Sequence, residues 1–246
     1  MKHAFAAFCS ALSYFTIFPL GPLASRVAPD PLAISFLPFI GAAVGALAGL
    51  LASLLGAHGS LWWPIAAWIV LIFATGAIHV DGFLDCCDGL FASATPRRRL
   101  EILQDPRHGT FALVGMAVLT VVWIAAIARI PLAHLVLSLA FAGALARISA
   151  IVNAWVFPYA RAGAVTAAFV SPPNVAIVAL GAALTSALGW FVDPLLFAFV
   201  PAAIACSLIL GWWASRRLGG GLTGDVFGAI VVVIDVAALV AIGIPR

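Results

Sequence analysis

The chain has 246 residues, of which 65% are hydrophobic and only 9% are charged, and its mean hydropathy of +1.19 lies far above that of soluble globular proteins. Its formal net charge of +3 rests on 12 basic residues, too few for the electrostatic footprint of a nucleic-acid-binding protein. Lipid admits only helices or closed barrels, and the long apolar runs lack the alternation that a barrel requires. The composition predicts an all-α, polytopic transmembrane helix bundle forming one integral-membrane domain over residues 1–246.

The first apolar segment, residues 5–20, is shorter than the roughly 20 residues that a spanning helix needs. We expect this segment to lie flat on the membrane or to enter it partway. A lone Lys2 before it and Leu23-Ala24-Ser25 after it leave a cleaved signal peptide as an alternative.

Six to seven membrane-spanning helices are predicted after this segment. The first candidate, residues 32–57, carries Gly41, Gly45 and Gly49 at four-residue spacing, which predicts a ridge of small residues against which another helix packs closely. Incidental glycines in an alanine-rich span are the alternative. The remaining candidates are residues 61–80, 111–130, 132–157, 175–192, 195–214 and 226–244.

Three acids follow the second candidate span within eight residues, although the whole chain has only nine acids. Asp81, Asp85 and Asp88 stand at positions i, i+4 and i+7, so a helix would present all three carboxylates on one face. Crowded carboxylates repel one another unless a cation lies between them, and oxygen ligands favour Mg²⁺ or Mn²⁺. We therefore predict a magnesium site here, with a solvated acidic helix end as the alternative.

Residues 81–110 form the most polar part of the chain and include four arginines. Thr95 and Pro96 have the pattern of an N-cap and first residue, which predicts a short helix near residues 96–104. Arginine is also enriched in the other loops that alternation places on the same side of the membrane, at 21–31, 158–174 and 214–225. The positive-inside rule therefore predicts that all four polar segments face the cytoplasm.

Arg147 lies well inside the predicted span 132–157, where an unpaired charge is costly. Asp235 lies at a similar distance along its own span, about ten residues beyond Asp225, so an ion pair with Arg147 is the leading structural hypothesis. A contact between Arg147 and substrate phosphate is the functional alternative.

Several motifs together resemble the cobalamin synthase family, whose members are also called adenosylcobinamide-GDP ribazoletransferases. The resemblance covers nearly the whole chain in order, and its most specific parts are the acidic segment and the Thr-Gly-Asp loop. The matching segments are His79-Val80-Asp81-Gly82, Asp85-Cys86-Cys87-Asp88-Gly89, Leu100 to Thr110, Arg147, Tyr159-Ala160-Arg161 and Gly220 to Ala229.

This resemblance implies a Mg²⁺-dependent enzyme of the cell inner membrane, with its active site facing the cytoplasm. The implied reaction joins adenosylcobinamide-GDP to α-ribazole or its 5′-phosphate and releases GMP. Membrane lipid is a further implied partner, a homo-oligomer is left open, and no nucleic acid is involved. The implied metal ligands are Asp81, Asp85 and Asp88; the implied catalytic residues are Asp105, Arg107, Arg147 and Arg161; and the implied substrate-binding residues are His79, Gly89, Gly109, Thr110, Tyr159, Thr223, Gly224 and Asp225.

Three positions depart from the family pattern. Val232 and Asp235 stand where family members have glutamates in the last span, and Pro106 replaces a serine. These departures leave open whether the last helix contributes to the site as it does in the family.

Two other functions remain as alternatives. A CDP-alcohol phosphatidyltransferase would share the Asp-x-x-Asp-Gly motif, but Ser93 replaces the arginine of that signature. A transporter would explain an intramembrane Arg147, although its polar groups should lie near mid-membrane rather than gather at one face.

Overall fold

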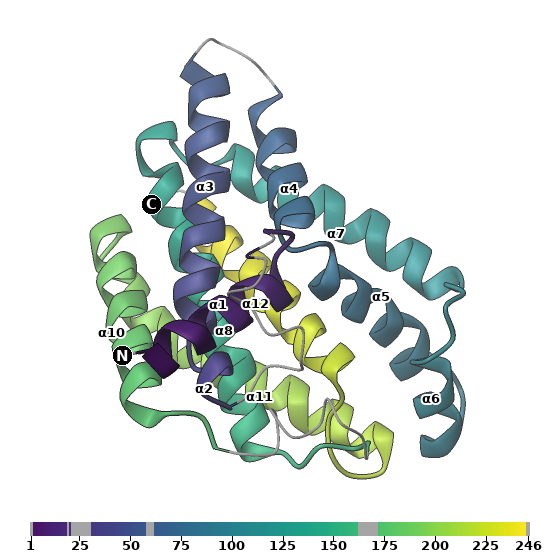
Figure 1. Ribbon diagram of the computed structural model, residues 1–246. Helices are drawn as coiled ribbons and strands as arrows, with labels where there is room; N and C mark the ends of the chain where they lie inside the picture. Colours follow the sequence, from purple (N-terminus) through teal and green to yellow (C-terminus); the bar gives the residue numbers. More distant parts are fainter. Residues whose placement is uncertain (1, 19, 21–30, 58–61, 162–171, 245–246) are drawn as a thin grey trace.

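The computed structural model describes residues 2–18, 20, 31–57, 62–161 and 172–244, and within these residues every regular element is a helix (Figure 1). Six helices are long and apolar enough to cross a membrane, or seven if one bent pair is a single span, which confirms the predicted bundle. The helices are α1 (Lys2–Phe15), α2 (Pro31–Ile34), α3 (Leu37–Ala57), α4 (Trp63–Ala74), α5 (Ile78–Phe91), α6 (Pro96–Ile102), α7 (Thr110–Ala128), α8 (Leu132–Val156), α10 (Val175–Val192), α11 (Leu196–Leu218) and α12 (Gly224–Gly243).

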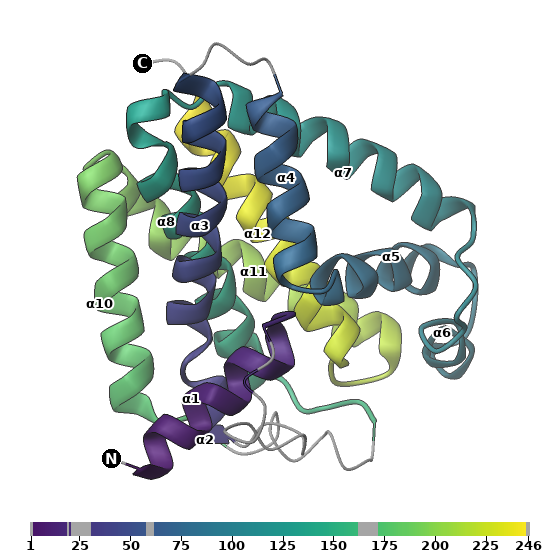
Figure 2. The ribbon, with the colours of Figure 1, turned by 45° about the horizontal axis from the view of Figure 1, so that its top comes forward.

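Helix α8 forms the centre of the bundle, because α3, α10, α11 and α12 all pack against it (Figures 1 and 2). Its most apolar stretch is 83% buried, whereas the corresponding stretches of α7, α10 and α11 are only 22–28% buried. Outward-facing apolar side chains on these three helices are what contact with lipid requires.

The glycine ridge of α3 is the surface that packs on α8, as its spacing predicts. A Cβ atom added at Gly41 or Gly45 would collide with the carbonyl oxygen of Gly143 or Leu139, and one at Gly49 would lie 2.7 Å from the Cα of Val136. The two backbones therefore approach too closely for any larger residue.

We expect Gly45→Val to lower the thermal unfolding temperature in detergent, because the added atoms would force α3 away from α8. Overpacking of this kind costs about 1–3 kcal/mol of unfolding free energy. Ala43→Val is the matched control, since Ala43 lies two residues away on the exposed face of α3. Equal losses in both variants, measured by tryptophan fluorescence, would show that the ridge does not determine the packing.

The predicted span 61–80 is wrong as a single straight helix. Helix α4 has 12 residues and ends at Ala74, after which the chain turns by 90° into α5. Gly76 and Ala77 both have positive φ angles, 58° and 59°, which no helix interior adopts. At the rise of an α-helix, α4 is only about 18 Å long, which is too short to cross the membrane. Helix α5, which carries the acids, lies at 90° to α4 (Figure 2).

Two arginines, one from α6 and one from α11, donate hydrogen bonds to the carbonyl oxygens at the C-terminal end of α5. The buried Arg99 donates to the carbonyl oxygens of Gly89, Leu90 and Ala94, and Arg217 also donates to Leu90. Helix carbonyls at a C-terminus lack partners within the helix, so these bonds satisfy them. Part of the arginine enrichment that indicates topology therefore also has a structural role.

The predicted short helix near residues 96–104 is present as α6, which ends at Ile102. The Thr95 side chain accepts a hydrogen bond from the backbone of Arg98, and Pro96 occupies the first turn, as expected for an N-cap. Helix α11 continues through Arg216 and Arg217 and ends at Leu218. It is capped by Gly219, whose φ is 85°. The glycine-rich loop is therefore shorter than the predicted 214–225.

The first apolar segment forms the 14-residue helix α1, which is too short to cross the membrane. It lies across the lower ends of α3 and α8 in Figure 2, and its Phe8 ring packs edge to face on Phe36 at 5.6 Å. The alternative cleavage site at residues 23–25 lies outside the described residues, as does most of the loop 21–31.

Candidate active site

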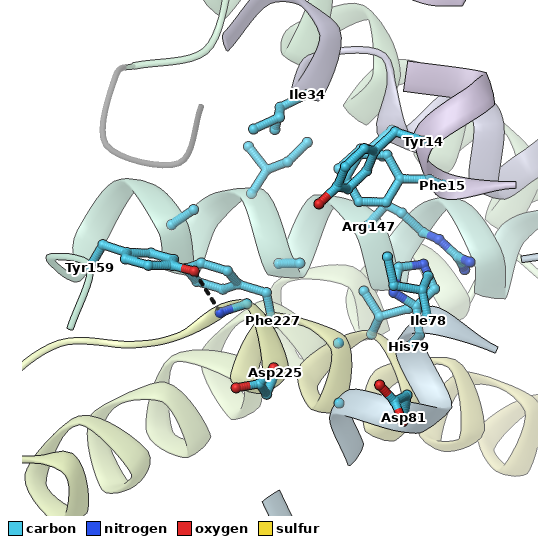
Figure 3. A pocket seen from close by; sticks show the side chains of 18 of the residues that line it. Tyr14, Phe15, Ile34, Ile78, His79, Asp81, Arg147, Tyr159, Asp225 and Phe227 are labelled. Atoms are coloured by element: carbon cyan, nitrogen blue, oxygen red, sulfur yellow. Dashed lines mark hydrogen bonds between the residues drawn. The ribbon is translucent and has the colours of Figure 1, made fainter. Parts of the chain in front are cut away.

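A cavity of about 400 Å³ opens where α1, α5, α8 and α12 meet the segment after α8. The carboxylates of Asp81 and Asp225 lie on one side and the Tyr14, Phe15 and Ile34 side chains on the other (Figure 3). Seven of the predicted site residues line it: His79, Asp81, Arg147, Tyr159, Arg161, Gly224 and Asp225.

Two loops that are distant in sequence are joined at the polar side of this cavity. The backbone of Leu222 donates to Pro158 at 2.8 Å, and that of Ala160 donates to Leu222 at 2.7 Å. The Tyr159 hydroxyl oxygen accepts a hydrogen bond from the backbone of Gly224 (Figure 3). Burial raises the pKa of Tyr159, so its hydroxyl stays neutral and keeps a proton to donate.

The central polar contact of the cavity is an ion pair between Arg161 and Asp225, whose closest atoms lie 3.2 Å apart. Arg161 also donates to the carbonyl oxygen of Leu100, and Asp225 accepts from the Thr223 hydroxyl. These contacts hold the guanidinium in place with both of its terminal nitrogens engaged, a geometry that suits phosphate oxygens as well.

Gly82 brings α5 against the start of α12. A Cβ atom added there would lie 2.7 Å from the backbone oxygen of Asp225, so only glycine permits this approach. The contact places Asp81 and Asp225 on the same side of the cavity (Figure 3). Gly82 belongs to one of the motifs, but its role could not be predicted from the sequence, because the contact depends on how α12 packs against α5.

The three predicted metal ligands lie on one helix, as their spacing requires, but their side chains have different surroundings. Asp81 and Asp85 both face His108, with closest nitrogen–oxygen distances of 4.0 and 3.8 Å. Asp88 instead accepts hydrogen bonds from the backbones of Gly109 and Ala112 at the start of α7. His108 was not predicted as a site residue, although it belongs to the Asp-Pro-Arg-His-Gly-Thr segment that carries the resemblance.

Among the residues that the structure describes, no group of three acidic, histidine or cysteine side chains is already arranged to hold a metal ion. The donor chemistry nevertheless suits Mg²⁺, because Asp81, which lines the cavity, and Asp85, which lies near the same histidine as Asp81, both offer hard carboxylate oxygens. The imidazole of His108 lies beside both carboxylates, with closest nitrogen–oxygen distances of 4.0 and 3.8 Å. The magnesium site therefore stays a prediction.

Eight predicted residues lie outside the cavity lining: Asp85, Asp88 and Thr223, whose contacts are given above, and the five described next. Asp105 and Arg107 pair with each other at 2.8 Å on the exposed surface, and this pairing lowers the pKa of Asp105 to about 2. Gly89 packs against the Leu103 side chain, and Gly109 caps α7, whose first residue is Thr110. Their catalytic and binding roles stay predictions.

Arg147 reaches the cavity from the buried face of α8 and donates to the Gly143 carbonyl oxygen at 3.3 Å. The predicted ion pair with Asp235 is not formed within 4.0 Å, although both residues line a small adjoining cavity of about 20 Å³ together with His79. Val232 lines the same small cavity. The two departures of the last helix therefore lie next to Arg147, away from the Arg161–Asp225 pair.

Comparison with known proteins identifies the family of the chain. The chain is 32% identical over 244 residues to the adenosylcobinamide-GDP ribazoletransferase of Syntrophobacter fumaroxidans, covering 95% of this chain and 96% of that protein. It is 33% identical to the enzymes of the same name from Deinococcus radiodurans, with 97% and 86% coverage, and Brucella ovis, with 83% of each chain. No solved structure matches the chain. A family model described as cobalamin-5-phosphate synthase matches residues 7–243, and the chain belongs to this family.

Proposed function

We propose that this chain is the transferase that joins adenosylcobinamide-GDP to α-ribazole, or to its 5′-phosphate, with release of GMP. The product is adenosylcobalamin or its 5′-phosphate, which places the reaction at the final stage of cobalamin biosynthesis. The observation that carries the proposal is the cavity in which Arg161, Asp225 and Asp81 converge from three separate segments. The names of its relatives favour this reaction over phosphatidyl transfer or transport.

In the proposed reaction, a ribose hydroxyl oxygen of the acceptor attacks the phosphorus that carries the corrinoid. The bond between this phosphorus and the oxygen bridging to GMP breaks, and GMP leaves with that oxygen. Arg161 donates to phosphate oxygens as negative charge shifts toward the leaving group. Asp225, which lies on the same side of the cavity as Asp81, accepts the proton of the attacking hydroxyl.

Asp81 and Asp85, which lie together beside His108, are the residues that would hold Mg²⁺. The bound ion would neutralise part of the diphosphate charge. The backbone N–H of Gly224 already has the Tyr159 hydroxyl as its acceptor, so the loop Gly221–Asp225 is held rigid before substrate binds. Rigid positioning of donors before the reaction is what makes electrostatic stabilisation effective.

Purified protein in detergent should release GMP when adenosylcobinamide-GDP, α-ribazole and Mg²⁺ are all present. Omitting the acceptor or adding a chelator should stop the release. GMP and the corrinoid product are measured together by chromatography. Absence of both products in several detergents and in lipid nanodiscs would overturn the proposal.

We also propose that the cavity faces the cytoplasm from the inner membrane. Arginines at positions 97–99, 161, 216 and 217 support this orientation through the positive-inside rule, and the substrate nucleotide is cytoplasmic.

Cysteine labelling tests this orientation. In a background without the native cysteines, cysteine at the exposed Ser93 should resist an impermeant thiol reagent in intact cells and react in inverted vesicles. Cysteine at the exposed His134, near the start of α8, is the control and should react from outside. The reverse pattern at both positions would invert the topology.

A further inference from the structure

We infer that the apolar side of the cavity is the subsite for the heteroaromatic base of the acceptor nucleoside. The wall in question, here called the aromatic wall, consists of Tyr14, Phe15, Ile34, Leu37 and Ile151. This inference rests on the proposed function and names which part of which substrate the wall contacts.

The aromatic wall lies across the same cavity from the carboxylates of Asp81 and Asp225, here called the charged side. Figure 3 shows Tyr14, Phe15 and Ile34 on one side and Asp81 and Asp225 on the other. A nucleoside has the same division, because its base is apolar and aromatic whereas its ribose carries the reacting hydroxyl. Seating the base on the wall therefore directs the ribose toward the charged side, where the diphosphate must react.

Phe15 is the residue best placed to contact a planar base. Its ring is 7% exposed and lies nearly parallel to the His79 ring, with an interplanar angle of 15° and a centroid distance of 6.3 Å. Phe15 also packs in a small core cluster with Ile34, Leu37 and Ile151, which holds it in place. Aromatic rings fixed in this way favour offset stacking with a planar heterocycle.

The size and polarity of the cavity favour the acceptor base as the occupant of the aromatic wall over the corrin macrocycle and the guanine of the other substrate. A corrin macrocycle is several times larger than a nucleoside and cannot enter a cavity of about 400 Å³ whole. Guanine has several N–H and C=O groups at its edge, and the aromatic wall offers them only the Tyr14 hydroxyl. Because unpaired buried polar groups are costly, the wall suits the nearly apolar bicyclic base of α-ribazole.

Helix α1 gains a function from this assignment. Tyr14 and Phe15 stand at its end, and the helix is too short to cross the membrane. Its position across the bundle brings these two side chains to the cavity (Figure 3). Tyr14 is 38% exposed and Phe15 is buried, so the two rings form the lip and the inner surface of the wall.

The test compares two acceptors, α-ribazole and an α-nucleoside that carries imidazole in place of the bicyclic base. We expect Phe15→Leu and Tyr14→Leu each to raise the KM for α-ribazole, about tenfold for Phe15→Leu. The KM for the imidazole nucleoside and for adenosylcobinamide-GDP should stay near the wild-type values. Phe5→Leu is the matched control, because Phe5 lies on the same helix and is 58% exposed away from the cavity.

Two results would overturn the assignment. One is an increased KM for adenosylcobinamide-GDP with unchanged discrimination between the acceptors, which would place the corrinoid or guanine on the wall. The other is a lower KM of the wild-type protein for the imidazole nucleoside than for α-ribazole. Thermal unfolding of each variant shows whether the fold is lost. Tyr14→Leu should disturb the fold less than Phe15→Leu, because Tyr14 lies partly at the surface whereas Phe15 is buried.

Direct binding separates this inference from the proposed function. Calorimetric titration of the purified protein with α-ribazole alone should show binding that Phe15→Leu weakens about tenfold. If no GMP is released but this binding difference is found, the reaction is wrong and the subsite stands. If GMP is released but the variants bind both nucleosides like the wild type, the subsite is wrong and the reaction stands.

Discussion

Replacing Asp81 or Asp85 with asparagine is expected to reduce GMP release by roughly 10³-fold at saturating Mg²⁺. Each substitution removes one carboxylate oxygen from the proposed Mg²⁺ site that Asp81 and Asp85 form beside His108. In the absence of metal, the same variants should unfold at the wild-type temperature or above it, because carboxylates crowded in one place repel one another. Thermal unfolding with and without Mg²⁺, together with a GMP assay, measures both effects.

Glu101→Gln is the matched control for these variants. Glu101 is an acid of the same polar segment, but it forms exposed ion pairs with Arg97 and Arg98 on α6. Exposed pairs contribute little to stability, so this variant should behave like the wild type in both measurements. If Asp81→Asn and Asp85→Asn lost stability equally with and without Mg²⁺, the two acids would be structural partners of His108 rather than ligands.

Asp88 should behave differently from the other two acids. Its carboxylate accepts hydrogen bonds from Gly109 and Ala112 at the start of α7, so Asp88→Ala is expected to lower stability even without metal. Loss of such a cap costs about 0.5–2 kcal/mol. Without metal, replacing a carboxylate that caps a helix should therefore lower stability, whereas replacing a carboxylate of the proposed Mg²⁺ site should not.

Arg161→Lys is expected to lower kcat/KM for adenosylcobinamide-GDP by about 10²-fold, although it keeps the positive charge. Arg161 uses one terminal nitrogen for Asp225 and the other for the Leu100 carbonyl oxygen. Lysine is a point donor and cannot make both contacts and also meet a phosphate with a planar fork. Steady-state kinetics of GMP release measure the loss.

Arg97→Lys provides the comparison for this substitution. Its side chain is 93% exposed on α6, where it pairs only with Glu101 among the described residues. We expect its kinetics to match the wild type. Full activity of Arg161→Lys would mean that charge alone is needed at this position, and the geometric argument for a phosphate clamp would fail.

Much of the architecture follows from local patterns in the sequence. Long apolar segments specify spanning helices because lipid leaves the backbone no other way to pair its polar groups. The spacing of Gly41, Gly45 and Gly49 indicates a close helix contact before its partner is known, and Thr95-Pro96 indicates the start of a short helix. Each of these signals depends only on residues within one or two helical turns, so the sequence alone is sufficient.

The motifs also indicate which residues belong to the site, but not how they meet. Leu222 is joined by backbone hydrogen bonds to Pro158 and Ala160, more than 60 positions earlier in the chain. This junction brings Arg161 to Asp225. The aromatic wall could not be predicted at all, because Phe15 lies in an apolar segment that contains no motif or charged residue to mark it as part of a site. Such contacts depend on how distant helices pack, which no local pattern contains.

The sequence by itself determined that this protein is a helical membrane protein, and its motifs assigned it to a transferase family. Only the tertiary structure decided that α5 turns by 90° at Ala77, that Asp88 caps α7, and that Arg147 and Asp235 remain unpaired. The physical reason is the sequence distance over which each interaction acts. Periodicity and helix propensity depend on residues close together in the chain, whereas the left-handed turn, the cap from a distant helix and the surroundings of a buried charge depend on how distant segments pack.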